Sequence, residues 1–317
     1  MRTWKNNLRL ACYWLVFTTL VCGWLSPGTT RAQIGPPVTF AAPQTVAVGE
    51  PFLVRFSSPE KLDAVKITWG NQHIRPSITA SNGIHLALAI LGTGMNAKSG
   101  MAILIVSAKS AGEFRTYQKR IEIAPKKFPR EALSVAPKMN KPPEEILGRI
   151  KRELAAMRKA RRTVSAERKW QVPFHRPVEG MMLSRFGLHR TFNKETKRRH
   201  TGLDFRAPLG TDIAAIAAGR VILVGDFYLP GNTVAIDHGN GVVSISMHLS
   251  EVLVSEGDRV KHGQVFGRSG ATGRVTGAHL HLSVSVQGTA VDPAPLFEMA
   301  TPPETAALSF QKNKPAR

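Results

Sequence analysis

The chain has 317 residues, enough for about two domains that each bury a core of their own. Its 43 lysines and arginines outnumber 22 acidic residues and give a net charge of +21, which excludes an acidic surface and favours polyanionic partners. Charge alone leaves nucleic acid, cell-wall polymers, anionic lipid and a merely solvated surface as alternatives. Cys12 and Cys22 are the two cysteines and both lie near the N-terminus, so a disulfide framework is excluded for the rest of the chain.

Residues 1–32 have the pattern of a secretory signal peptide. Basic residues precede an apolar stretch at 10–25, and small residues then lead to a cleavage position after Ala32. The apolar stretch is short for a membrane-spanning helix, so an uncleaved anchor is the less favoured alternative. We therefore expect an exported protein of the periplasm or cell envelope. Export argues against nucleic acid as a partner and favours the anionic envelope surface, with transient membrane contact.

Residues 33–124 are predicted to form a small β domain. Short apolar or alternating runs are separated by turns that contain Gly, Asn, Ser or Pro. The predicted strands are 52–56, 65–69, 84–91, 102–108 and 120–123. Several short strands at this spacing are typical of a β-sandwich of immunoglobulin-like type. His73 and His85 stand apart without an acidic partner, so we expect a binding or positioning module here.

Residues 125–169 are predicted to be a linker followed by a basic amphipathic helix. The first part is rich in Pro and Lys, and two prolines followed by Glu144 and Glu145 suit the first turn of a helix. An apolar stripe at helical spacing consists of Leu147, Ile150, Leu154 and Met157. We expect this helix to pack against a domain as a spacer. The stripe is narrow, which disfavours a membrane-surface helix.

Residues 170–299 are predicted to form an antiparallel β-sheet domain. The predicted strands are 213–216, 221–224, 233–236, 242–247, 252–254 and 281–286. A turn is predicted at 237–241, which makes His238 a turn residue. The remaining segment, 300–317, is rich in Pro, Lys and Thr and is expected to be a disordered basic tail.

Two pairs of polar residues are expected to share a strand face in the second domain. Side chains alternate between the faces of a strand, so positions separated by an even number lie on the same side. His200 and Asp204 are four positions apart, and His279 and His281 are two apart, with intervening leucines directed into the core. Two imidazoles on one face suit a metal site, although a lone His-x-His pair also occurs on purely structural strands.

A third strand is expected to add His248. The odd-numbered residues of 243–247 are apolar and are expected to face the core, which leaves Ser244, Ser246 and His248 on the other face. Three strands with histidine on a polar face are hard to explain by packing alone. A buried imidazole needs a hydrogen-bond partner or a metal, and one ion satisfies several rings at once.

These motifs resemble the lysostaphin/LytM-type zinc endopeptidases, a metallopeptidase family that cuts peptidoglycan peptides. The resemblance covers about residues 173–299. Besides the histidine motifs it includes residues 184–187, 207–211, 219–221, 237–241, 257–260, 263–264 and 291–293. The N-terminal β domain and basic helix are similar to the corresponding part of envelope members in Gram-negative bacteria. The expected fold is therefore mainly β, with an immunoglobulin-like sandwich, a linking helix and an antiparallel β-sheet metallopeptidase domain.

The resemblance implies a role for each of five residues. His200, Asp204 and His281 correspond to the ligands of one Zn²⁺ per chain, and His248 and His279 to two unligated catalytic histidines. Three protein ligands leave one position open for water, as a catalytic zinc requires. The implied function is a secreted zinc metalloendopeptidase that hydrolyses cross-links or stem peptides of peptidoglycan, with a zinc-activated water as nucleophile.

Two further residues are assigned to substrate binding. Ser246 stands where the family commonly has Tyr, so the aromatic side wall of the substrate site is missing here. Arg199 ends a basic run before the first ligand, which is either a solvated loop or a cleft rim that attracts carboxylates of wall peptides. Two other functions stay open at this point. They are a non-catalytic member that activates a wall amidase, and a basic structural protein in which zinc only stabilises the fold.

Overall fold

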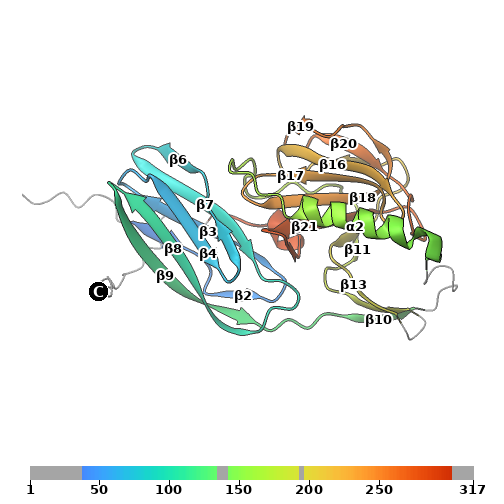
Figure 1. The fold of residues 1–317 in the computed structure, drawn as a ribbon, viewed down its shortest axis with the longest axis horizontal. Helices are drawn as coiled ribbons and strands as arrows, with labels where there is room; N and C mark the ends of the chain where they lie inside the picture. The colour runs from blue at the N-terminus through green and yellow to red at the C-terminus, as the bar shows by residue number, and fades with distance from the viewer. Residues whose placement is uncertain (1–37, 134–141, 193–195, 302–317) are drawn as a thin grey trace, which may run out of the picture. The chain divides into compact units, whose positions relative to one another are not determined.

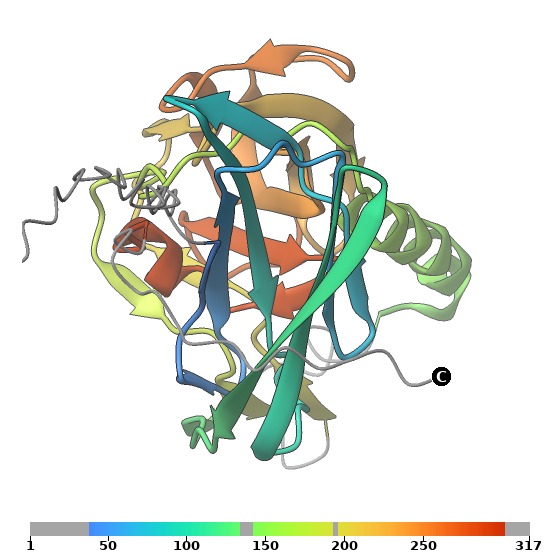
Figure 2. The ribbon, with the colours of Figure 1, turned by 90° about the vertical axis from the view of Figure 1, so that its left-hand side faces the viewer.

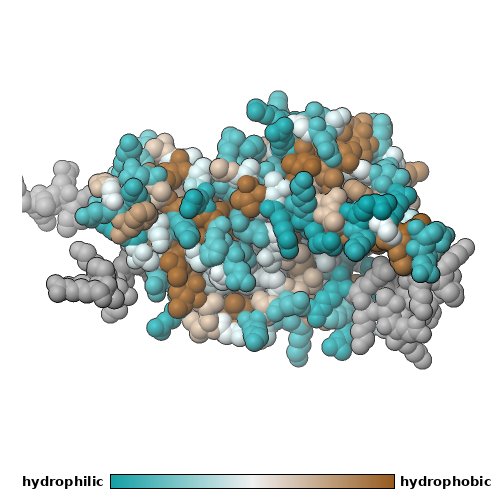
Figure 3. Space-filling model, in the orientation of Figure 1, coloured by the Kyte–Doolittle hydropathy of each residue, from teal (hydrophilic) through white to brown (hydrophobic). Residues whose placement is uncertain are grey.

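The computed structural model describes residues 38–133, 142–192 and 196–301 (Figure 1). The predicted signal peptide, and all but the first two residues of the predicted basic tail, lie outside these ranges. Strands dominate the described residues, which confirms the prediction of a mainly β protein. Within the described ranges, no helix has the length and apolar character needed to cross a membrane. The face shown in Figure 3 mixes hydrophilic residues with several hydrophobic patches.

Residues 39–124 form a β-sandwich of two sheets that share one core. In spatial order, the first sheet contains β1 (Thr39–Ala41), β3 (Pro51–Ser58), β7 (Ile84–Gly92) and β6 (Ile78–Ser81). The second contains β2 (Thr45–Ala47), β9 (Glu113–Ala124), β8 (Gly100–Ser110), β4 (Ala64–Trp69) and β5 (Gln72–Ile74). The two long strands β8 and β9, teal to green in Figure 2, form an antiparallel hairpin. Side chains from both sheets, including Phe56 and Leu104, form one buried hydrophobic cluster. The sandwich is therefore confirmed, and its immunoglobulin-like type stays a prediction.

The linking segment differs from its prediction in two respects. It contains a strand, β10 (Arg130–Leu133), which pairs in parallel with β12 (His189–Phe192) although its sequence carries no strand pattern. After a short 3-10 turn (η1, Glu144–Ile146), helix α2 spans Leu147–Arg161. The predicted stripe is only half right, because Leu147 and Leu154 are 48% and 41% exposed. The buried residues of the helix are Ile150, Met157 and Ala160, of which Met157 and Ala160 pack against residues of β17 and β18.

The C-terminal domain contains one ten-stranded sheet and one small sheet. The path of the large sheet is β11 (Met182–Ser184), β14 (Leu203–Phe205), β21 (Leu280–Val286), β18 (Val242–Val252), β17 (Gly231–Asp237), β16 (Gly219–Phe227) and β19 (Arg259–Val260). Beside this path lie β15 (Asp212–Ala214), β20 (Val265–Ser269) and β22 (Thr289–Val291). The small sheet joins β10 and β12 to β13 (Thr196–Arg199), and a 3-10 turn (η2, Ala294–Phe297) closes the domain.

Every pairing in the large sheet is antiparallel, as predicted. The predicted strand at 252–254 is wrong, because β18 ends at Val252. The apolar residues after it do not continue the ladder, although Leu253 N–H donates to the carbonyl of Phe266.

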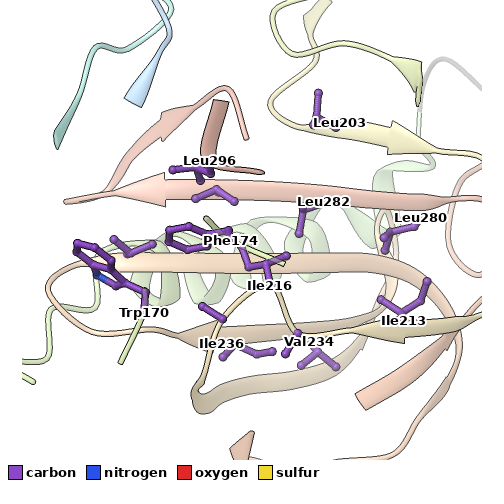
Figure 4. Packing of buried hydrophobic residues seen from close by; sticks show 14 of the residues in the cluster. Trp170, Phe174, Leu203, Ile213, Ile216, Val234, Ile236, Leu280, Leu282 and Leu296 are labelled. Carbon is purple, nitrogen blue, oxygen red and sulfur yellow. The ribbon is translucent and has the colours of Figure 1, made fainter. Parts of the chain in front are cut away.

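Strand β21 and residues 242–249 of β18 are buried on both faces. One face packs into the main core, where Leu280 and Leu282 lie among the residues of Figure 4. On the other face, Val243 and Ile245 contact helix α2, which runs beside β18 in Figure 1. A strand enclosed in this way has little freedom to shift its register, because one residue of slip would exchange the two faces. Side chains carried by β18 and β21 are therefore held in place.

His238 lies in the predicted turn, yet its ring belongs to the core. The ring is fully buried and packs edge-on against Phe174, with ring centroids 6.5 Å apart. Nδ1 donates to the carbonyl of Ala218 at 2.9 Å, so Nε2 accepts from the hydroxyl of Ser244 at 2.7 Å. Burial lowers the pKa of His238 to about 4. The turn motif predicted the backbone and gave no sign that the ring is enclosed.

We expect His238 to make folding stability depend on pH. The unfolded chain binds a proton below a pKa of about 6.5, and the folded chain binds one only below about 4. Stability is therefore complete above pH 6.5 and falls as the pH decreases toward 4, by roughly 2 kcal/mol between pH 7 and pH 5. Urea unfolding of wild type and His238→Gln at both pH values tests this. The variant should be less stable at pH 7 but lose less on acidification, and equal losses in the two proteins would contradict the assignment.

Candidate metal centre and active site

Three predicted ligand residues converge on one point. The distance from Asp204 Oδ1 is 2.9 Å to His200 Nε2 and 2.8 Å to His281 Nδ1, and the two nitrogens are 3.0 Å apart. Asp204 on β14 pairs directly with His281 on β21, and Asp204 and His281 are only 7% and 8% exposed. The chain thus brings two imidazoles and one carboxylate together as a group that can hold a metal ion.

The secondary structure that brings His200 and Asp204 together differs from the predicted one. His200 and Asp204 were expected on one strand, but His200 follows the end of β13 and Asp204 belongs to β14. A bend at Thr201–Gly202 separates them. Gly202 lies so close to β21 that a Cβ there would overlap the carbonyl of Leu282 and approach His281 Nε2 to 2.8 Å. The even spacing therefore gave the right pair of residues for the wrong reason.

The hydrogen bonds around the group decide where the protons are. His200 Nδ1 donates to the carbonyl of Arg185 at 2.9 Å, which leaves a lone pair on Nε2. The hydroxyl of Ser283 donates to the carbonyl of Thr201 at 3.2 Å. It therefore accepts from His281 Nε2, 3.1 Å away, which leaves a lone pair on Nδ1. These outer contacts hold both rings in the tautomer that a metal needs.

Three acceptor atoms thus face one another with no proton donor between them. A cation is what such a group lacks. In a tetrahedral zinc site the ligand atoms lie about 3.4 Å apart, so a slight expansion of the group admits Zn²⁺, for which imidazole and carboxylate are common ligands. The residues present therefore fit zinc.

Two further imidazoles lie beside the group. The rings of His248 and His279 have centroids 4.9 Å apart, and those of His248 and His281 are 6.2 Å apart. His248 Nδ1 donates to the carbonyl of Thr272 at 3.0 Å, and His279 Nδ1 to that of Gly277 at 2.9 Å. Both rings thus carry a lone pair on Nε2 and can accept a proton there. Burial, with smaller effects of His281 and His279, lowers the pKa of His248 to about 4, so it is neutral at pH 7.

His248 reaches the site because the strand alternation breaks at this residue. Ser246 pairs with Leu282 and Met247 with His281, so Met247 lies on the metal side and Ser246 on the core side. Simple alternation would therefore point His248 away from the metal ligands. Instead His248 has a left-handed backbone, with φ at 66°, next to a register shift between β17 and β18. This bulge turns the ring toward the other histidines, and the sequence held no signal for it.

The two predicted substrate-binding residues have different outcomes. Ser246 is 3% exposed and faces the core opposite Leu282, so it is not placed to touch a substrate. Ser246 was expected on the polar face of its strand, but its pairing with Leu282 places it on the core face. Arg199 is exposed directly before His200, and its guanidinium donates to Asn96 Oδ1. Its assignment to substrate binding stays a prediction.

Arg190 is a residue near the site that sequence reasoning missed. Its guanidinium lies 3.9 Å from Asp204 Oδ2 and donates to Ser184 Oγ at 2.6 Å. It also pairs with Glu131 of β10 at 3.1 Å, which fastens the linking strand to the small sheet that leads to His200. Nothing in the sequence marks Arg190 or Glu131, because their proximity depends on the pairing of β10 with β12.

Comparison with known proteins agrees with the geometry. Residues 198–293 match the model of peptidase family M23, and this range contains all five histidine and aspartate residues of the site. The peptidoglycan DD-endopeptidase ShyA of Vibrio cholerae is 42% identical over 105 residues, which are 32% of this chain and 24% of that protein. The DD-carboxypeptidase/endopeptidase Mpg of Neisseria meningitidis is 42% identical over 123 residues, which are 38% of this chain and 28% of that protein. These alignments span only about a quarter of the length of either relative.

One solved structure is similar over most of the chain. It is a putative peptidase M23 from Pseudomonas aeruginosa, 30% identical, with a TM-score of 0.59. The match covers 79% of this chain and 94% of that one, and so extends beyond the peptidase domain. Together with the family match to the metal-site segment, this likeness confirms the predicted resemblance and shows that the chain belongs to peptidase family M23.

Proposed function

We propose that the chain is a zinc metalloendopeptidase that hydrolyses peptide bonds in peptidoglycan. The observation that carries this proposal is the convergence of three unprotonated ligand atoms with two further imidazoles whose Nε2 atoms are free to accept a proton. The name of ShyA, a peptidoglycan DD-endopeptidase, supports a substrate of cell-wall peptides. The complete set of five residues argues against a non-catalytic activator, and two unligated histidines argue against a purely structural zinc.

The residues divide into a binding set and a proton-transfer set. His200, Asp204 and His281 would hold Zn²⁺, which when bound supplies a positive charge that acidifies water and polarises a carbonyl group. His279 Nε2 is 3.9 Å from Asp204 Oδ1. The His279 side chain is 18% exposed, so a bound substrate can reach it. We assign to His279 the removal of a proton from the attacking water. His248 is more buried and neutral at pH 7, so we assign to it the delivery to the leaving amine of a proton that originates from the attacking water.

We also propose that this chemistry takes place outside the cytoplasm. The signal-peptide pattern of residues 1–32 supports export, and so does the name of ShyA, which gives peptidoglycan, a polymer of the cell envelope, as its substrate. The high positive charge supports attraction to an anionic wall and membrane surface. Arg199, exposed beside His200, is the residue we assign to contact with carboxylates of the wall peptides.

Digestion of purified, cross-linked peptidoglycan sacculi tests the proposed function. Residues 33–317 loaded with one equivalent of zinc should release monomeric muropeptides, which mass spectrometry identifies together with the bond that is cut. His279→Ala should release none, because the proton acceptor is gone while the metal ligands remain. Zinc-loaded wild type that leaves every peptide bond intact would contradict the proposal.

The division between ligands and proton-transfer residues predicts a pattern of zinc affinity. His200→Ala and Asp204→Ala should each weaken zinc binding by more than about 100-fold, since each removes a ligand atom. His248→Ala and His279→Ala should bind zinc as wild type does and yet lose cleavage. Competition with a chromogenic chelator measures the affinities. Equal zinc retention in all four variants would overturn the division of roles.

Gly202 should be required for the metal group, because β14 and β21 approach closely at this point. Gly202→Ala places a methyl group against Leu282 and His281, so we expect zinc affinity to fall about tenfold or more and the melting temperature to fall. Gly277→Ala is the matched control, since a Cβ there has no atom within 4 Å. Its zinc affinity and melting temperature should equal those of wild type. Equal behaviour of the two variants would show that the close approach is unimportant.

A further inference from the structure

Helix α2 lies outside the segment that matches the family model, yet it contacts a loop of the active-site domain. Glu153 on α2 accepts a hydrogen bond from Tyr228 N–H at 2.9 Å through Oε2. Its other oxygen pairs with Arg149 Nε at 2.5 Å, and the guanidinium of Arg149 donates to the carbonyl of Asp226 at 3.1 Å. The Glu153 side chain is only 14% exposed. The helix therefore holds the tip of the β16–β17 hairpin by two adjacent side chains.

That hairpin loop in turn holds the backbone of His248. The loop has three residues, because Phe227 pairs with Gly231 across it. The carbonyl of Pro230, two residues after Tyr228, accepts the hydrogen bond of His248 N–H at 2.9 Å. The carbonyl of Leu229 accepts from Arg274 N–H at 2.9 Å, which joins the loop to the segment that carries Thr272.

Thr272 completes the support of the histidine ring. Its hydroxyl accepts from Asn232 N–H at 3.0 Å and donates to the carbonyl of Leu249 at 2.8 Å. Its carbonyl accepts from His248 Nδ1 at 3.0 Å and so sets the direction of Nε2. The hairpin loop and the Thr272 segment are in close contact, since a Cβ on Gly231 would overlap Thr272. The two hydrogen bonds that fix His248 therefore come from the hairpin loop and from Thr272, which pack against each other. Helix α2 holds this loop at Tyr228.

His248 depends on this support more than an ordinary strand residue would. Its left-handed backbone is unfavourable for a residue with a side chain, and such a conformation persists only where the surroundings enforce it. Without the Glu153 carboxylate, the N–H of Tyr228 would lose its acceptor and the loop its anchor to the helix. The loop could then move with the Pro230 carbonyl, and His248 would relax toward the alternating strand geometry that points away from the metal ligands.

We propose that Glu153 is a positioning residue for His248, acting through the Tyr228–Pro230 loop. The role rests on the proposed function, because it assigns to helix α2 the task of holding the histidine that delivers a proton in peptide hydrolysis. Glu153 touches neither substrate nor metal ligand. Its effect is on the orientation of one ring.

Three variants of the full chain separate positioning from simple loss of structure. Glu153→Ala removes the acceptor, whereas Glu153→Gln keeps an oxygen for Tyr228 N–H but loses the charge and the acceptor for Arg149 Nε. Glu145→Ala is the matched control, since Glu145 is an exposed acid eight residues earlier in the chain. For a soluble cross-linked muropeptide we expect Glu153→Ala to lower kcat about tenfold or more with KM nearly unchanged. Glu153→Gln should recover most of kcat, and Glu145→Ala should equal wild type.

A second readout does not depend on turnover. Two-dimensional NMR of the histidine side-chain nitrogens, with the His248 signals assigned by their absence in His248→Gln, reports the hydrogen bond of Nδ1 to Thr272. Glu153→Ala should shift or broaden the His248 signals and leave those of His200 and His281 in place, with zinc affinity unchanged.

Unaltered His248 signals in Glu153→Ala would overturn the positioning role. Equal losses of kcat in the Gln and Ala variants would do the same. If wild type cleaves no peptide, the proposed function fails, and the NMR comparison still decides the positioning role.

Discussion

The pairing of β14 with β21 is the constraint on which the site depends. It sets Asp204 opposite His281, while Leu280 and Leu282 anchor the same strand in the core on the other face. Because β21 is enclosed on both faces, the carboxylate and the imidazole cannot separate without disturbing the domain interior. Gly202 makes the approach possible, as it has no side chain to keep the two strands apart. The fold thus assembles a group of acceptor atoms that could hold a metal ion.

Backbone carbonyls decide the proton positions in this site. Those of Arg185, Thr272 and Gly277 each accept the Nδ1 proton of a different histidine, so three rings present an unprotonated Nε2 inward. A carbonyl group has no acid–base chemistry of its own near neutral pH. The tautomers are therefore fixed by the main chain, and they stay fixed as long as the loops that carry these carbonyls keep their place. This dependence explains why elements remote from the chemistry, such as helix α2, bear on it.

The sequence predicted correctly those strands and helices whose local hydrophobic pattern matches their burial in the fold. Alternating apolar runs predicted the long strands of both domains, and the helical spacing after Pro143 predicted α2. It failed where pairing alone creates a strand. The segment Arg130–Leu133 has no strand pattern and becomes β10 only beside β12. It also failed on how far an element is buried, since the width of the apolar face of α2 and the enclosure of His238 depend on what packs against them.

For the site, the sequence by itself determined the chemistry. It supplied the five residues, their assignment to a zinc endopeptidase family and the expectation that His279 and His281 share a face, because these depend on residue type, motif and local alternation. The tertiary structure alone decided how the residues meet. It placed His200 after the end of β13 and Asp204 within β14, put Ser246 in the core and turned His248 toward the other histidines by a left-handed bulge. Those outcomes depend on register and on close approach between distant segments, which no local pattern encodes.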